Sequence, residues 1–396
     1  MVLSKLKDYI IFISVSVVLF TLMVVIETKN GKFSTEDFKV FYMAAKAMLG
    51  GEQVYGVSFG LSTGFYKYSP FMLFIFSGYT LFSFKIAAII HFIISSLAAI
   101  FSIILLEQFV DKYIITNIKR RVFTSFLILF SVLLHIVRDL HIGNTNTIII
   151  FLFILTIKFI LEHKEIVAGI LFALIILLKP YFIVLVLILF LFKKKNTLLS
   201  LVATGVVLTL FTGAIWGFVK SYNLHLEWFK AMLDHSGYLY SPYTISYLLD
   251  YYLGISIPQS FTFILLGILV LLISFIFWNS SKKSSLKERN KSLIIGFFVI
   301  IALIPSVLIT DVEHFIFSLP IIAILIFYLK NKKNYLWIGI FVLVVFMFGG
   351  NSQDLVGKEL TLKIKEWGWV GIANLIFIIT LITAYFLDKR TLKLKD

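Results

Sequence analysis

The chain has 396 residues, of which 60% are hydrophobic and 14% are charged, and its net charge is +15. A soluble globular domain is about half apolar, so the composition excludes a soluble protein and indicates a polytopic membrane protein. The chain contains no cysteine, which excludes disulfides and thiolate metal sites. Its basic residues are dispersed among short loops between apolar runs, which is typical of cytoplasmic anchors and argues against a nucleic-acid partner.

Twelve apolar runs predict an all-α protein with about twelve transmembrane helices. A further apolar stretch, 71–84, is short and contains Gly78, so we expect it to lie in or dip into one leaflet. The first run lacks a small-residue cleavage site, so no cleavable signal is expected. The runs cover residues 9–27, 86–106, 122–137, 147–161, 166–178, 181–192, 197–217, 261–278, 292–309, 315–329, 335–349 and 369–386.

The basic clusters decide the expected orientation. If 71–84 does not cross, both termini and the clusters "NIKRR", "KKK" and "SKKSSLKERNK" lie in the cytoplasm, as the positive-inside rule requires. The unusual polar stretches then face the outside, and ionisable groups at membrane depth indicate function. We divide the chain into a membrane module at 1–217 with its first outside loop at 28–85, an outside loop at 218–260, and C-terminal transmembrane helices at 261–396.

The stretch "STEDFKVFYMAAKAMLGG" (34–51) predicts a short interfacial helix. Ser34 and Asp37 have capping-box spacing, and Gly50-Gly51 is a typical stop. The Asp37 carboxylate either complements the helix dipole or does chemistry, and the spacing alone leaves both interpretations open. Apolar residues recur between the two ends at helical spacing, namely Phe38, Phe41, Tyr42, Ala45 and Leu49.

The pair Lys179-Pro180 separates two apolar runs that are each too short to span alone. A proline there predicts a helix break, whose freed backbone groups need water or a partner. Broken helices of this kind line polar cavities. Lys179 itself either faces such a cavity or extends to the lipid headgroups.

Several stretches together resemble glycosyltransferase family 87, within the GT-C superfamily of transferases that use polyprenyl-phosphate sugars. "DFKVFYMAAKAMLGGEQVY" (37–55) followed by "YKYSPFMLFIF" (66–76) is similar to the first outside loop of that family. The stretches "HIGNTNTIIIFLF", "AGILFALIILLKPYFIVLVLILFLFKKK" and "SPYTISYLL" are similar to its later segments, in the same order. Asn144 stands where the family usually has Gln, and "TDVEHF" replaces a Trp-x-His, so the sugar and the acceptor stay open.

The resemblance implies an inverting transferase that moves mannose or another hexose or pentose from polyprenyl phosphate to a glycolipid or glycan. It also implies that Asp37 is the general base, with Glu36 as the alternative. The expected ligands of the donor phosphate are Lys179, Arg138 and His314, although Arg138 alternatively pairs with the adjacent Asp139. The expected pocket for sugar or acceptor comprises Glu36, Tyr42, Tyr68, His141, Asn144, Asn146, Tyr181 and Glu313.

For Asn144 and Asn146, an ordinary role as a cap of the helix that follows is the alternative to a pocket role. The Tyr-rich loop 218–260 with Trp228 suits sugar stacking, but Tyr and Trp also populate membrane interfaces for physical reasons. No His and Asp spacing, including Asp234-His235, gives a credible ligand set, so we expect no metal and no cofactor.

The expected location is the bacterial cytoplasmic membrane, with the active site facing outside and lipids as surroundings. A transporter or flippase of a lipid-linked or anionic substrate is the alternative function, because it explains the broken helix and the spans equally well. Transporters often show matching interruptions in two halves, whereas this chain has one clear Lys-Pro break. A non-catalytic scaffold that binds a lipid-linked glycan is a third, weaker reading.

Overall fold

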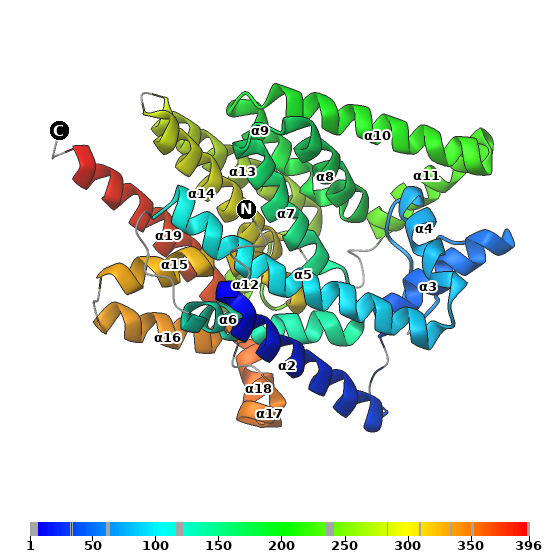
Figure 1. Ribbon diagram of the computed structural model, residues 1–396, viewed down its shortest axis with the longest axis horizontal. Coiled ribbons are helices and arrows are strands. Elements are labelled where there is room, and N and C mark those ends of the chain that lie inside the picture. Colours follow the sequence, from blue (N-terminus) through cyan, green and yellow to red (C-terminus); the bar gives the residue numbers. More distant parts are fainter. Residues whose placement is uncertain are drawn as a thin grey trace. The chain divides into compact units, whose positions relative to one another are not determined.

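The computed structural model describes residues 7–393 except 32, 34, 61–63, 116–121, 235–240, 283, 309, 333–334 and 350–351. Within these residues the regular elements are helices, and the β-structure is one isolated bridge between Ser58 and Phe65 (Figure 1). The predicted all-α class is confirmed. The chain forms two compact units, which are described separately: unit 1 comprises residues 1–12, 103–136 and 240–396, and unit 2 comprises 13–102 and 137–239.

Unit 2 is built around α8, which packs against α7 on one side and α10 on the other, so that the three helices lie side by side (Figure 1). The short helix α3 packs against α4, and α11 returns against α10. The elements lying wholly or mostly in this unit are α2 (Ile10–Lys29), α3 (Glu36–Gly50), α4 (Pro70–Ser77), η2 (Gly78–Leu81), α5 (Phe84–Tyr113), α7 (Asn146–Leu161), α8 (Glu165–Leu178), η3 (Pro180–Leu185), α9 (Val186–Leu191), α10 (Lys195–Trp216) and α11 (Phe218–Asp234).

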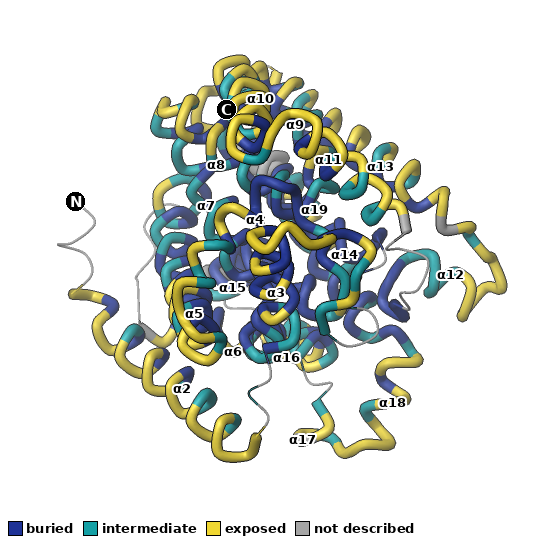
Figure 2. Tube along the Cα trace, turned by 90° about the vertical axis from the view of Figure 1, so that its right-hand side faces the viewer, coloured by how far each residue is buried: buried dark blue, intermediate teal, exposed yellow. Residues whose placement is uncertain are grey.

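Unit 1 has α14 at its centre, where nearly every residue of the helix is buried (Figure 2). This helix packs against α13, α15, α19 and η5. α6 (Val122–Ile142) lies mostly in this unit, and its last residues belong to unit 2. The remaining elements of unit 1 are η1 (Lys7–Tyr9), α12 (Ile245–Leu253), α13 (Gln259–Ser281), α14 (Leu286–Val307), η5 (Val312–Ser318), α15 (Leu319–Lys332), α16 (Tyr335–Gly349), α17 (Gln353–Val356), α18 (Lys358–Glu366) and α19 (Trp369–Lys393).

The helices confirm the polytopic architecture. Of the twelve predicted spans, eight correspond to helices that are long and apolar enough to cross a membrane, counted among the described residues. The other four correspond to shorter apolar helices, namely α7, α8, the η3–α9 segment and α16. The stretch predicted not to cross forms the short segment Pro70–Leu81.

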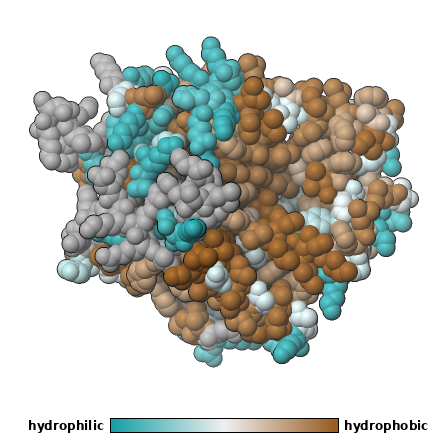
Figure 3. Space-filling model, in the orientation of Figure 1, coloured by the Kyte–Doolittle hydropathy of each residue, from teal (hydrophilic) through white to brown (hydrophobic). Residues whose placement is uncertain are grey.

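Apolar side chains cover much of the surface as well as the core, as the face in Figure 3 shows. In unit 2 the outward faces of α2 and α10 expose many large hydrophobic residues. Such surface is stable in lipid, where helix association depends on close packing and interhelical hydrogen bonds instead of the hydrophobic effect.

Three local predictions about helix ends can be compared with the structure. α3 begins at Glu36 with Thr35 as its N-cap, one residue later than the Ser34/Asp37 spacing predicts, and Ser34 lies outside the described residues. The C-terminal stop is confirmed, because Gly51 adopts a left-handed φ of 76° after the last residue of α3. The predicted break is also confirmed: α8 ends at Leu178, and Pro180 begins the 3-10 helix η3.

Candidate functional site

The first turn of α3 is held in an unusual backbone conformation. Thr35, its N-cap, has φ 44° and ψ 51°, a left-handed geometry that costs a non-glycine residue of order 1–3 kcal/mol. Thr35 is buried, and its hydroxyl finds no hydrogen-bond partner among the residues that the structure describes. Backbone strain of this kind collects at functional sites because surrounding contacts must hold it in place.

The turn between α6 and α7 supplies those contacts. Gly143 has φ +69°, and a Cβ added there would lie 2.7 Å from the Cβ of Phe38 and 3.3 Å from the Cβ of Thr35. Only glycine combines this φ with such a close approach of the two segments. Gly143 therefore allows the stretch "HIGNTN" to press directly against the start of α3.

Asp37 and Asn144 meet at this contact. The Asn144 side-chain amide donates to Asp37 Oδ2 at 2.6 Å, across 107 residues of sequence. The backbone N–H of Thr145 donates to Asn144 Oδ1 at 2.7 Å, which fixes the orientation of the amide and leaves its Nδ2 to face the carboxylate. Asp37 is half-buried as a residue, and the Asn144 amide orients its carboxylate.

Tyr68 supports the same amide from the first loop. Its hydroxyl lies 3.3 Å from Asn144 Oδ1 and 2.9 Å from Thr145 Oγ1. Its ring packs on Phe41 of α3 at 4.8 Å between centroids. Tyr55 in turn donates its hydroxyl to the Tyr68 backbone carbonyl at 2.7 Å, and burial raises the pKa of Tyr55 well above its usual value, with the Glu227 carboxylate as the second cause.

His91 on α5 lies under the first turn of α3. Its ring stacks on Phe38 with 4.7 Å between centroids. Its Nε2 lies 3.3 Å from the Asn144 backbone carbonyl, which can only accept, so Nε2 carries the proton and Nδ1 accepts from the Tyr79 hydroxyl at 3.4 Å. A neutral His91 thus holds the backbone of Asn144 in place, and the Phe38 ring covers the His91 ring.

A second, fully buried polar network begins two residues further on. Asp139 accepts from the Asn146 side chain at 2.8 Å and from the backbone N–H of Thr147 at 2.9 Å, so this carboxylate caps the first turn of α7. Lys179 donates to Asn146 Oδ1 at 2.5 Å and interacts electrostatically with Asp139. Asp139, Asn146 and Lys179 are all buried, and opposite charges in a protein interior are stable only when such hydrogen bonds accompany them.

The sequence of this chain matches the pattern of glycosyltransferase family 87 over residues 65–309, more than half of its length. The chain belongs to glycosyltransferase family 87. No curated protein sequence matches it. The family match includes Tyr68, the "HIGNTN" turn and Lys179, whereas Asp37 precedes the matched range and Glu313 and His314 follow it.

In this family 87 glycosyltransferase the predicted residues of unit 2 do not all converge. Asp37, Tyr68 and Asn144 form one hydrogen-bonded group, and Asn146 and Lys179 belong to the buried network next to it. The other predicted residues lie around these two groups. Three of them are half-buried: Glu36 near Gly60, Arg138 beside Asp139, and Tyr181 in η3. The other two have hydrogen-bond partners. Tyr42 donates to the Phe82 carbonyl at 2.9 Å, and His141 pairs with Glu27 at 2.8 Å.

Glu313 and His314 belong to unit 1. Both are buried at the start of η5, with 3.7 Å between His314 Nδ1 and Glu313 Oε1. His314 Nδ1 also lies 3.2 Å from the Asp311 carbonyl. Their assignment to the donor phosphate and to the pocket stays a prediction.

The glycosyltransferase holds no group of three or more metal-ligating side chains within its described residues. The expectation that it needs no metal or cofactor stays a prediction.

Sequence reasoning missed four residues that shape the site: Thr35, His91, Gly143 and Thr145. His91 carried a usable signal, because it is an ionisable residue within an apolar run. Gly143 carried a weaker signal, since glycine beside Asn in a turn often has positive φ. The conformation of Thr35 and the contact of Thr145 with Tyr68 have no counterpart in the local sequence.

Proposed function

We propose that the protein is an inverting glycosyltransferase that moves a sugar from polyprenyl phosphate to a glycolipid or glycan acceptor, with Asp37 as the general base. The observation that supports this proposal is the half-buried Asp37 carboxylate, fixed at 2.6 Å by the Asn144 amide. A general base must present an ionised, oriented oxygen within reach of a substrate hydroxyl. The Asn144 amide, which is itself held by hydrogen bonds, fixes the orientation of the Asp37 oxygen.

The reaction is a single displacement. The acceptor hydroxyl oxygen attacks the anomeric carbon of the donor sugar, and its proton passes to Asp37. The bond between that carbon and the phosphate oxygen breaks, and polyprenyl phosphate leaves with the electron pair. One displacement inverts the anomeric configuration and needs one base and no covalent intermediate.

The leaving phosphate gains negative charge, which positive groups must balance. We propose Arg138 and Lys179 of unit 2 for this task; the assignment of His314, which lies in unit 1, stays a prediction from the sequence resemblance. Arg138 is half-buried, with its Nη1 atom inside the protein, and Lys179 is buried and donates to Asn146. Both cations are therefore proposed to act on the phosphate through their positive charge, and Lys179 also fixes Asn146. The proposal includes no metal, because these cations supply the charge.

The proposed location is the bacterial cytoplasmic membrane, with Asp37 on the outer side. The positions of the basic clusters support this orientation. The donor is then delivered within the bilayer, and the acceptor carries mannose, another hexose or a pentose after the reaction.

The test compares Asp37→Asn with Glu36→Gln in purified protein supplied with a panel of polyprenyl-phosphate sugars. Asp37→Asn removes the base while keeping the shape of the side chain, so we expect no detectable transfer and unchanged donor binding. Glu36→Gln removes the alternative base, and because Glu36 is also a predicted pocket residue we expect it to lower transfer without abolishing it. Turnover of Asp37→Asn near that of the native protein would reject Asp37 as the base.

A further inference from the structure

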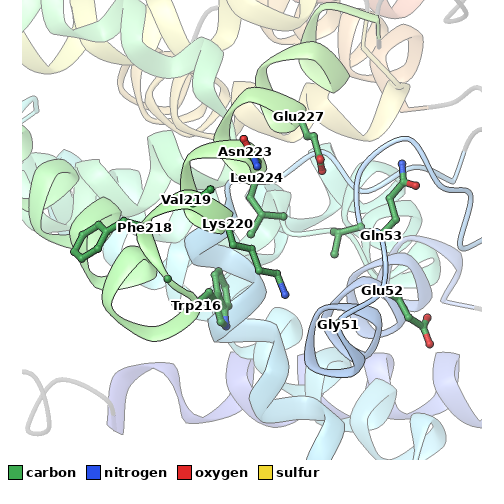
Figure 4. A pocket seen from close by; sticks show the side chains of 12 residues that line it. Gly51, Glu52, Gln53, Trp216, Phe218, Val219, Lys220, Asn223, Leu224 and Glu227 are labelled. Atoms are coloured by element: carbon green, nitrogen blue, oxygen red, sulfur yellow. The ribbon is translucent and has the colours of Figure 1, made fainter.

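Unit 2 contains a cavity of about 770 Å³ at the C-terminal end of α3 (Figure 4). One wall is the turn at 51–54 that follows α3, and the other is the end of α10 with the first half of α11. A Cβ added at Gly51 or Gly217 would meet nothing within 4 Å, so both glycines border open space. The volume lies in the range that small-molecule sites occupy.

The lining combines two aromatic residues, Trp216 and Phe218, with several polar groups. Trp216 offers an aromatic surface, and Lys220 extends from α11 towards the turn at Gly51 (Figure 4). Asn223, Glu227, Gln53 and Glu52 add amide and carboxylate groups. An aromatic face with planar amides and carboxylates matches a sugar ring, whose C–H face is apolar and whose hydroxyls both donate and accept.

The charge of the lining argues against an anionic ligand. The ammonium of Lys220 is opposed by the carboxylate of Glu227, whereas the carboxylate of Glu52 turns away from the cavity (Figure 4). The lining therefore offers a phosphate or an anionic headgroup no net positive charge. A neutral polyol satisfies the carboxylates through its hydroxyl donors and the ammonium through its oxygens.

The cavity lies apart from Asp37. Asp37 is in the first turn of α3 and Gly51 follows the last, so at 1.5 Å per residue the two ends are about 20 Å apart. The cavity is therefore too remote to hold the reacting hydroxyl. Binding energy from parts of a substrate far from the reacting atoms is a recognised means of orienting it.

Contacts connect the cavity wall to the candidate active site. Trp228, next to Glu227 on α11, donates its indole N–H to the Lys67 carbonyl at 3.0 Å. Lys67 precedes Tyr68, whose hydroxyl approaches the amide that holds Asp37. Both places thus belong to one packed part of unit 2.

α11 also indicates how the cavity is oriented. Beyond the cavity lining, its exposed apolar residues recur every three or four positions and form one stripe along the helix, typical of a helix at a membrane surface. The stripe consists of Tyr222, Leu226, Phe229 and Leu233. With this stripe in lipid, the lining residues of the same helix lie at the level of the headgroups, where the glycan of a membrane-bound acceptor is found.

We infer that this cavity is a binding subsite for a neutral carbohydrate, the part of the acceptor glycan remote from the hydroxyl that reacts. The acceptor role rests on the proposed function; the recognition of a neutral saccharide rests on the cavity alone.

The test measures binding of neutral tetrasaccharides of mannose, glucose and galactose to the detergent-purified protein by saturation-transfer NMR. Lys220→Ala removes a cavity donor, and Lys230→Ala removes an exposed lysine of the same helix that does not line the cavity. We expect one tetrasaccharide to bind, about tenfold more weakly to Lys220→Ala and unchanged to Lys230→Ala. Trp216→Phe is expected to retain part of the binding, because it keeps an aromatic face.

Asp37→Asn distinguishes this proposal from the proposed function, because it is expected to bind the tetrasaccharide normally while transferring no sugar. Absence of binding by every tetrasaccharide, equal binding by Lys220→Ala and the native protein, or displacement of the saccharide by inorganic phosphate would overturn the inference. Saccharide binding by a native protein that transfers no sugar from any lipid-phosphate donor would contradict the proposed function and leave the neutral-carbohydrate site standing.

Discussion

Asn144→Ala gives the sharpest test of how the site works. The substitution removes the 2.6 Å hydrogen bond to Asp37 and also the 2.7 Å hydrogen bond that Asn144 Oδ1 accepts from the Thr145 N–H. A hydrogen bond to a charged group contributes about 1.5–3 kcal/mol, which corresponds to about 10- to 150-fold in rate. Because Asp37 is only half-buried and water replaces part of the loss, we expect kcat/KM to fall by about 10- to 30-fold.

The assay follows release of polyprenyl phosphate from a radiolabelled donor by the purified protein. Asn144→Gln keeps the amide, and Gln is the residue that the family usually carries here, so most activity is expected to return. Asn374→Ala is the stability control: Asn374 is a buried amide of unit 1 that donates to the Ala302 carbonyl at 2.7 Å and to Ser306 at 2.8 Å. Its loss lowers the melting temperature without a matching loss of kcat/KM.

A double-mutant cycle separates the proposed mechanism from a general structural effect. If Asn144 acts through Asp37, then Asn144→Ala lowers kcat/KM less in an Asp37→Glu background, where the carboxylate is displaced from the amide and measurable transfer is expected to remain, than in the native protein. The reasoning would be refuted by additive losses in this cycle. An Asn144→Ala protein with kcat/KM within twofold of the native value would refute it as well.

Three further predictions concern packing and topology. Gly143→Ala forces a side chain onto φ +69° and into the start of α3. We expect it to lower the free energy of unfolding by about 1–3 kcal/mol and with it the melting temperature. Gly205→Ala, in open space on α10, is the control and is not expected to lower the melting temperature. Asp139→Ala uncaps α7 and removes the counter-charge of a buried ammonium, and thermal unfolding should show a loss of about 3–5 kcal/mol. The chain contains no cysteine, so single cysteines can report the topology. Ser285→Cys is expected to react with a membrane-impermeant maleimide only from the cytoplasm, and Phe59→Cys only from outside. The reverse pattern would contradict the proposed orientation.

The sequence determined the architecture of this protein. Long apolar runs define helices because a backbone in lipid must satisfy its own hydrogen bonds. Pro180 and Gly51 determined a break and a stop through restrictions that act within one or two residues. The order of short motifs over several hundred residues identified the family.

Only the tertiary structure decided which polar residues meet. Asp37 and Asn144 are 107 positions apart, and the apolar helices between them are hydrophobic on nearly every side, so their sequences do not specify which face turns inwards. The same ambiguity left Lys179 and Asn146 as independent candidates, although packing of α7 against α8 joins them in one buried network. Local rules determine where helices begin and end, whereas contacts between helices depend on the close packing of the whole unit. That packing alone brought the Asp37 carboxylate and the Asn144 amide together.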